Sequence, residues 1–169
     1  MLKEYLKADL ARITEPTFGN FLKQYWFPRG GTYRYIVWFR IMQCLKLKKS
    51  KILSLPVYLI YRHYEYKYGI HMNTNIPVGK GIKIVHGDGV YVNCSSIGEN
   101  VTIYQNVTLG GSSGKEGIAK IEDFVTIYVG AVCVGDIVLE SGCSIGANAF
   151  VNQSVGKGKL AVGVPAVIK

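Results

Sequence analysis

A histidine followed closely by two glycines is the strongest candidate for chemistry in this sequence. His86 lies in the run Ile82-Lys-Ile-Val-His-Gly-Asp-Gly-Val90, where small residues leave space around the imidazole. Near pH 7 a neutral imidazole can remove the proton of a hydroxyl group while that hydroxyl attacks an activated acyl carbon. Because a lone histidine is more often structural, the case for a general base depends on the residues around it.

A glycine-rich run further along the chain is the second unusual segment. Gly110-Gly-Ser-Ser-Gly-Lys-Glu-Gly117 is not a phosphate-binding loop, because Leu109 stands where the G-x-x-x-x-G-K motif requires its first glycine. We interpret residues 110–120 as an excursion from a regular structure. The four cysteines, Cys44, Cys94, Cys133 and Cys143, have neither the C-x-x-C nor the histidine spacing of a zinc site, so no metal is predicted.

Both segments lie in a region with an internal period of six residues. Apolar side chains recur at Ile97, Ile103 and Leu109 and then at Ile121, Ile127, Cys133, Leu139, Ile145 and Val151. A second lane of small or β-branched residues follows at Val101, Val107, Val125, Ala131, Ile137, Cys143, Ala149 and Val155. Such a period is typical of a parallel β-helix, in which three hexapeptides close one triangular coil. An ordinary β-sandwich would not require strict sixes.

The period has one irregularity upstream of these lanes. Ile70, Ile76 and Ile82 also recur at sixes, but their register is shifted by three relative to Ile97. A kink or an insertion between His86 and Tyr91 would produce that shift. The candidate base would then lie at an irregular corner of the first coils.

Residues 1–68 have a different pattern, which is helical. Leu2, Tyr5, Leu6 and Leu10 share one stripe, and Ile36, Val37, Ile41, Cys44 and Leu45 share another. A further helix is expected to open at Ser54-Leu-Pro56 and to run to Tyr68. The sequence therefore predicts a small N-terminal helical cap over residues 1–68 and a mainly β domain over residues 69–169.

Charge separates the same two regions. The net charge of +9 lies entirely in residues 1–68, whereas residues 69–169 carry equal numbers of acidic and basic side chains. The basic, aromatic cap can be a solvated surface or can contact an anionic membrane as a peripheral protein. Nucleic acid is not expected as a partner, because no binding motif accompanies the charge. Charged residues near Met1 and the lack of a long apolar window favour a cytoplasmic protein, one that could lie at the inner face of a membrane.

The motifs together resemble the serine acetyltransferase family and its hexapeptide-repeat relatives that O-acetylate sugars. The matching segments, within residues 69–168, are His86-Gly-Asp-Gly, Val101-Thr-Ile-Tyr-Gln-Asn-Val-Thr-Leu-Gly-Gly111, the excursion, and Val162-Gly-Val-Pro-Ala166. The resemblance implies a left-handed parallel β-helix and a homotrimer. It also implies acetyl-coenzyme A as co-substrate in the groove between neighbouring subunits, with His86 at the place of the catalytic histidine.

The resemblance also suggests which residues contact the coenzyme. We expect Gly110, Gly111, Gly130 and Ala131 along the pantetheine arm, because small residues let it lie against the backbone. Lys157 and Lys159 are candidates for its phosphates, with a solvated turn as the equal alternative.

Two departures from the family concern the acceptor. Serine acetyltransferases have an aspartate before Ile-His-Pro that orients the catalytic histidine, and Gly69 holds that place here. Asp88 or a backbone carbonyl is expected to orient His86 instead. A second family histidine helps to hold the amino acid, and Ile118 holds its place. We therefore predict an O-acetyltransferase for a sugar hydroxyl in polysaccharide biosynthesis. Serine O-acetyltransferase and a non-catalytic β-helical scaffold are the alternatives.

Overall fold

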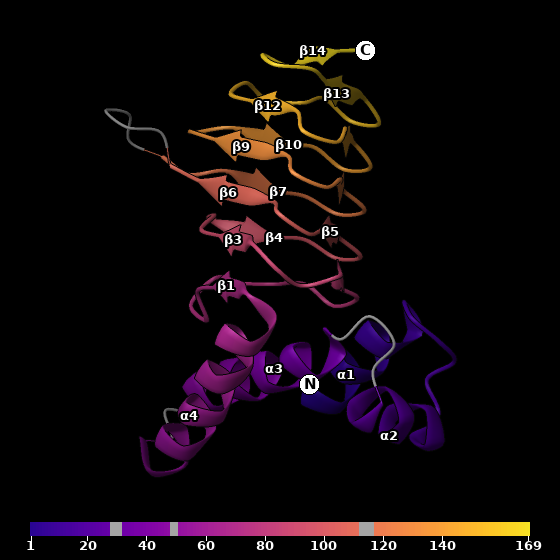
Figure 1. Cartoon of the computed structure of the whole chain (residues 1–169), viewed down its shortest axis with the longest axis vertical. Coiled ribbons are helices and arrows are strands. Elements are labelled where there is room, and N and C mark those ends of the chain that lie inside the picture. The colour runs from indigo at the N-terminus through magenta and orange to yellow at the C-terminus, as the bar shows by residue number, and fades with distance from the viewer. Residues whose placement is uncertain (28–31, 48–50, 112–116) are drawn as a thin grey trace.

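The computed structural model describes residues 1–27, 32–47, 51–111 and 117–169, with residues 51–53 as backbone only. A group of four helices at the N-terminal end is followed by a column of stacked strand coils (Figure 1). The helices are α1 (Leu2–Ala11), α2 (Phe18–Trp26), α3 (Tyr33–Leu47) and α4 (Lys51–Tyr68). None of the described helices combines the length and the hydropathy needed to span a membrane. A helical cap followed by a parallel β-helix is the architecture that the sequence predicts.

Helix α4 begins earlier than expected. It starts at Lys51 rather than near Ser54, so Pro56 lies inside it, in its second turn. Proline there removes one main-chain hydrogen bond close to the helix start, where the loss disturbs the fewest turns. Helix α2 has a conventional start, because the Thr17 side chain accepts a hydrogen bond from the Asn20 N–H at 3.2 Å.

The strands of the column form three sheets, one for each side of a triangular prism. Sheet I contains β1 (Ile70–Met72), β3 (Val90–Val92), β6 (Thr108–Gly110), β9 (Val132–Val134) and β12 (Phe150–Val151). Sheet II contains β4 (Ser96–Ile97), β7 (Lys120–Ile121) and β10 (Val138–Leu139). Sheet III contains β2 (Lys83–Val85), β5 (Thr102–Tyr104), β8 (Thr126–Ile127), β11 (Ser144–Ile145), β13 (Leu160–Val162) and β14 (Val167–Ile168). The chain visits the three sheets in turn, and among the pairs of described strands only the last, β13 with β14, is antiparallel.

The strand register confirms the hexapeptide period. Ile127 pairs with Ile145, 18 residues further on, so one coil consists of three hexapeptides. Ile103 pairs with Ile127 across 24 residues, because the excursion adds one further hexapeptide. An antiparallel bridge between Gly111 and Ile118 closes the base of the excursion. The rest of the predicted excursion, residues 112–116, lies outside the described residues.

Of the two explanations for the register shift near His86, a kink or an insertion, the structure shows an insertion. Val85 pairs with Tyr104 and Tyr91 with Thr108, so five residues separate the paired positions after β2, whereas three separate them one coil later. Ile70 pairs with Val90, which places the upstream lane in line with Val101 and Val107 rather than with Ile97. The shift of three therefore combines an insertion at the His86 corner with a change of lane.

The core runs continuously from the column into the cap. All nine residues of the first lane and all eight of the second are buried, as their periodicity predicts. Tyr35, Phe39 and Met42 of α3 and Tyr61 of α4 belong to the same cluster. The helices thus cover the first coil and shield its aliphatic interior from water, which an open end would expose.

A buried ion pair joins the cap to the first coils. Asp9 of α1 is fully buried and accepts hydrogen bonds from the Arg40 guanidinium at 2.9 and 3.1 Å. The same carboxylate accepts from the N–H groups of Gly81 and Ile82 at 2.8 and 3.0 Å. Both charges are therefore satisfied where the helices meet the corner after residue 79.

Candidate active site

His86 lies at the enlarged corner between sheets III and I, and its side chain is exposed. Its φ of 58° is in the left-handed region, as is the φ of 66° at Asp88. The corner is held against the end of α4, because the Asp88 N–H donates to the Tyr68 carbonyl at 2.6 Å. Gly87 is required there, since a Cβ would lie 2.3 Å from the same carbonyl oxygen. The cap therefore fixes the backbone that presents the imidazole.

Asp88 does not contact the His86 ring in this arrangement. No hydrogen bond or ion pair between the Asp88 carboxylate and the imidazole occurs in the described part of the chain. The main chain of Asp88 is used instead, since its carbonyl accepts from the Asn106 N–H at 3.0 Å in the next coil. That Asp88 orients His86 remains a prediction.

Gly130 lies on the same edge of the prism as His86. The corners between sheets III and I stack on one another. Gly89 lies next to Asn106 of the following coil, and Gly130 lies next to Asn148 of the coil after its own. A Cβ on Gly130 would lie 2.1 Å from the Asn148 side-chain oxygen, and its φ is 71°, so this corner favours glycine. Two coils separate Gly130 from His86, which corresponds to about 10 Å along the column.

Ala131 is not on the outer surface, although it follows Gly130. Its methyl group is fully buried in the second inner lane, and its N–H and carbonyl bond to Tyr128 and Thr108. An inward position in a hexapeptide repeat uses its small side chain for packing. Only the backbone of Ala131 could therefore face the pantetheine arm, and its contact with the coenzyme remains a prediction.

Gly110 and Gly111 lie on a different edge, between sheets I and II, where the excursion leaves the column. A Cβ on Gly110 would have no neighbour within 4 Å, so its backbone is open on the outside of the prism. Gly111 is exposed and faces Ile118, whose side chain would lie 3.5 Å from a Cβ on that glycine. An extended arm could lie against this open backbone.

Lys157 and Lys159 lie on the third edge, at the end of the column. Both side chains are exposed, and the Lys157 N–H donates to the Glu140 carboxylate at 2.8 Å. The predicted site residues thus fall on three different edges of one prism. A single chain brings Gly130 to the edge of His86 but does not bring the excursion glycines or the lysines there.

The first of the two departures, Gly69, has a structural consequence. Gly69 has a φ of 58°, and a Cβ there would lie 3.0 Å from Asp88 Cα and 3.1 Å from the Gly89 nitrogen. The enlarged corner therefore packs directly on this glycine. An aspartate at position 69 would require the corner to move.

A cluster beside the His86 corner was missed by the sequence analysis. The buried Glu65 carboxylate of α4 is paired with Arg62 at 2.6 Å and lies 3.6 Å from His71 Nδ1 of β1. The rings of Tyr66 and Tyr91 flank His71, with centroids at 6.1 and 6.4 Å. The helical period and the hexapeptide period each describe one region of the sequence. Neither indicates that the end of α4 packs against sheet I at this point.

The three buried cysteines, Cys94, Cys133 and Cys143, are packing residues rather than reactive groups. Burial raises the pKa of Cys94 and of Cys133 to about 12 and that of Cys143 to about 11. Their thiols therefore stay protonated near neutral pH and are poor nucleophiles. No cluster of three potential metal ligands occurs among the described residues.

Comparison with known proteins gives a consistent result. No protein-family model matches the chain. The serine acetyltransferases of Staphylococcus epidermidis and Staphylococcus aureus are 43% identical over 100 residues, which is 57% of this chain and 47% of theirs. The chain therefore spans about half the length of these curated relatives.

Solved structures match nearly the whole chain. Neisseria gonorrhoeae serine acetyltransferase in complex with serine has a TM-score of 0.79 and 29% identity, covering 98% of this chain and 68% of that one. Soybean serine acetyltransferase complexed with serine has a TM-score of 0.81 and 27% identity, covering 99% and 69%. A serine acetyltransferase complex with CoA has a TM-score of 0.75 and 26% identity, covering 99% and 68%. The similarity thus includes the helices as well as the column.

Proposed function

Because the chain belongs to the hexapeptide-repeat family that includes the serine acetyltransferases, we propose that it transfers an acetyl group from acetyl-coenzyme A to a hydroxyl group. His86 is the general base of this reaction. The observation that carries the proposal is that the one histidine of the matching motif has an exposed ring on an enlarged corner, within a fold shared with these enzymes.

The chemistry requires few groups from the protein. The His86 imidazole accepts the proton of the acceptor hydroxyl while the hydroxyl oxygen forms a bond to the thioester carbon. The carbon–sulfur bond then breaks, and the thiolate of the coenzyme takes up the proton, leaving an acetyl ester and a free thiol. No cysteine of the chain takes part, which agrees with the burial of Cys94, Cys133 and Cys143. The open backbone at Gly110 fits a pantetheine arm, since no side chain occupies its outer side.

Serine is the acceptor that the comparisons favour. The relatives are serine acetyltransferases, and two of the similar structures hold serine. The expectation of a sugar acceptor is therefore less well supported than the alternative. A sugar hydroxyl remains the second candidate, because Gly69 and Ile118 replace two acceptor-side groups of the family and Gly69 is built into the packing of the corner.

The distribution of the site over three edges supports a site shared between copies. A prism that assembles around a threefold axis can place the His86 edge of one copy beside the Gly110 edge of the next. We therefore propose a homotrimer in which each acetyl-coenzyme A contacts two chains. Lys157 and Lys159 would reach its phosphates only through the same assembly.

Release of coenzyme A tests the activity. With acetyl-coenzyme A and L-serine, we expect turnover that His86→Ala lowers by about 10²–10⁴-fold. His63→Ala is the matched control, because His63 is also exposed but lies on α4. No turnover with serine but turnover with sugars would select the second candidate. Coenzyme release that is independent of His86 would refute the assigned base, and no release with any acceptor would favour a scaffold.

Mixed assemblies test the shared site. His86→Ala and Gly110→Phe should each inactivate the homomer, the second by blocking the open backbone. Co-expression of the two variants should restore about one quarter of the sites, the random fraction in which an intact His86 adjoins an intact Gly110. No recovery would show that one chain holds the whole site.

The cap adds a further proposed partner, an anionic membrane surface. Phe18, Leu22 and Trp26 of α2 recur at four-residue spacing and are exposed, as is Phe27, in a region with a net charge of +9. Sedimentation with phosphatidylglycerol vesicles should be salt-dependent and should be lost in Trp26→Ser. Equal binding to phosphatidylcholine vesicles, which carry no net charge, would show that the basic residues of the cap do not contribute to membrane binding.

A further inference from the structure

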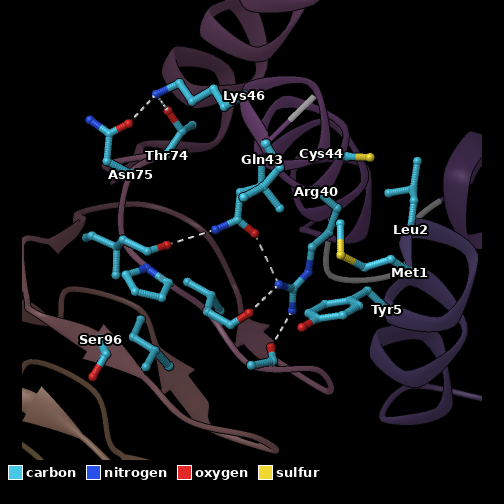
Figure 2. A pocket seen from close by; sticks show the side chains of 16 residues that line it. Met1, Leu2, Tyr5, Arg40, Gln43, Cys44, Lys46, Thr74, Asn75 and Ser96 are labelled. Atoms are coloured by element: carbon cyan, nitrogen blue, oxygen red, sulfur yellow. Dashed lines mark hydrogen bonds between the residues drawn. The ribbon is translucent and has the colours of Figure 1, made fainter. Parts of the chain in front are cut away.

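A pocket of about 640 Å³ lies between the cap and the first coils, on the side of sheet II. Its walls come from α1, α3, residues 74–79 and β4, and it does not include His86 or either excursion glycine. Its volume is typical of small-molecule sites. Figure 2 shows Lys46, Thr74 and Asn75 at one side of the pocket and Met1, Leu2 and Tyr5 at the other, with Arg40 between them.

Arg40 is a structural part of the wall and not a ligand-binding group. Its five N–H groups donate to five acceptors, namely both Asp9 oxygens, the Gln43 side chain and the carbonyls of Val78 and Gly79. Its charge is neutralised by Asp9, and the Tyr5 ring covers the guanidinium at 4.7 Å. The guanidinium therefore has neither a free donor nor a net charge to offer.

Lys46 is different, because its charge has no counterpart. Its ammonium donates to the Thr74 hydroxyl and, at 2.8 Å, to the Asn75 side-chain oxygen, which are both neutral. No carboxylate pairs with Lys46 in the described part of the chain, and none of the described residues that line the pocket is acidic. Partial burial lowers the pKa of Lys46, so an anion beside it would relieve an unfavourable environment.

The rest of the lining is mostly apolar. Leu2, Tyr5, Leu47, Ile76, Val78 and Ile97 form much of the wall. The polar groups of Gln43 are already used, because its amide donates to the Ile76 carbonyl at 2.8 Å and its oxygen accepts from Arg40. The pocket thus combines an apolar body with the cationic side chain of Lys46 at its edge.

We propose that this pocket binds an amphiphilic monocarboxylate, with its carboxylate on Lys46 and Asn75 and its apolar part directed toward Tyr5 and Leu2. The carboxylate supplies the missing negative charge and can accept the third N–H of the Lys46 ammonium. The apolar part replaces water along aliphatic walls. The ligand contacts both the helices and the first two coils, so it links the cap to the column.

The probe is decanoate, with decan-1-ol and decyltrimethylammonium as ligands of equal chain length that lack the anion. Titration calorimetry on the full chain should show saturable 1:1 binding of decanoate, and thermal unfolding should shift upward with its concentration. Lys46→Met should weaken decanoate binding at least about tenfold and leave the midpoint of unliganded unfolding nearly unchanged, because Lys46 is an exposed residue whose hydrogen bonds go to neutral surface groups. Ser96→Trp should block the pocket, since Ser96 lines it from the outer face of β4.

Cys44 gives an independent readout. It lines the pocket and is the one cysteine that is not buried. Decanoate should slow its reaction with a maleimide, and Lys46→Met should remove that protection. Lys120→Met is the matched control, because Lys120 pairs with Ser96 on the adjacent strand but lies outside the pocket.

Several results would overturn the proposal. Equal binding of decanoate, the alcohol and the ammonium compound would show unspecific apolar association. Affinity that is the same in Lys46→Met, Ser96→Trp and Lys120→Met would place the ligand elsewhere. Protection of Cys44 by phosphatidylglycerol vesicles in place of monomeric decanoate would indicate a membrane surface. Protection that rises with protein concentration alone would indicate a second copy of the chain as the occupant.

Discussion

The column and the cap are stabilised in different ways. Inside the column the same two lanes repeat, each position is aliphatic, small or a thiol, and each coil bonds to the next through its backbone. The cap has no repeat, and it depends on stacked aromatic rings and on one buried ion pair, Asp9 with Arg40. Repetition distributes stability over many equivalent contacts, whereas the cap concentrates it in a few specific ones. Single substitutions should therefore have more uneven effects in the cap than in the column.

Loss of the buried ion pair should have the largest effect on stability. Arg40→Met leaves the Asp9 carboxylate buried without its partner, which should lower the free energy of unfolding by about 3–5 kcal/mol. Urea unfolding measures the loss. Lys80→Met removes one half of the exposed Lys80–Glu99 pair nearby and should cost only about 0–1 kcal/mol. Similar losses in both variants would mean that burial does not distinguish the two pairs.

Truncating one side chain of an inner lane should lower the free energy of unfolding by about the same amount in any coil. Leu109→Ala in sheet I and Leu139→Ala in sheet II each remove a fully buried side chain, and each should lower the free energy of unfolding by about 3 kcal/mol. Calorimetry or urea unfolding gives both values. A loss below about 1 kcal/mol at either position would contradict the equivalence of the coils.

Alkaline pH should weaken the column before it weakens the cap. Burial raises the pKa of Cys94 and Cys133 from 9.0 to about 12, so above pH 9 the unfolded chain releases protons that the folded chain keeps. Because the unfolded state then binds fewer protons, the free energy of unfolding falls as pH rises, by about 2–3 kcal/mol between pH 8 and pH 10 for the two thiols. Burial also raises the pKa of Tyr35 and Tyr61 in the cap, which adds a fall at still higher pH.

A double variant isolates the thiols. Cys94→Ala with Cys133→Ala should remove about two thirds of the thiol contribution to the pH dependence of the urea-unfolding free energy between pH 8 and pH 10, because Cys143, whose pKa burial also raises, remains. An unchanged slope would show that other groups titrate in this range.

One hydrogen bond between the two regions should have the smallest effect. The Tyr61 hydroxyl of α4 donates to the Met72 carbonyl of β1 at 2.6 Å. Tyr61→Phe keeps the packed ring and should lower the free energy of unfolding by about 1 kcal/mol. Val57→Ala, on the same helix, is a packing control. If Tyr61→Phe lowered the free energy of unfolding more than Leu109→Ala, polar contacts would stabilise the junction of cap and column more strongly than aliphatic packing stabilises the coils.

Periodic features of the chain were predictable from the sequence. The two inner lanes, the coil of three hexapeptides and the insertion at His86 follow from apolar spacing, because an inward position recurs after every corner. The helical stripes of residues 1–68 are read in the same way. Features that depend on contact between the two regions were not predictable. The Asp9–Arg40 pair, the Glu65–His71 cluster and the pocket at Lys46 each join residues from elements whose packing leaves no local signal.

The site itself shows the same division. The amino-acid sequence determined which residue types are available, with His86 in a widened corner and glycines where the excursion leaves the column. Only the tertiary structure decided that these groups lie on separate edges and that Asp88 uses its backbone rather than its carboxylate. The physical reason is that a repeat fixes the direction of each side chain relative to its own coil. The position of one corner relative to another depends on how the coils close and how the helices pack on them.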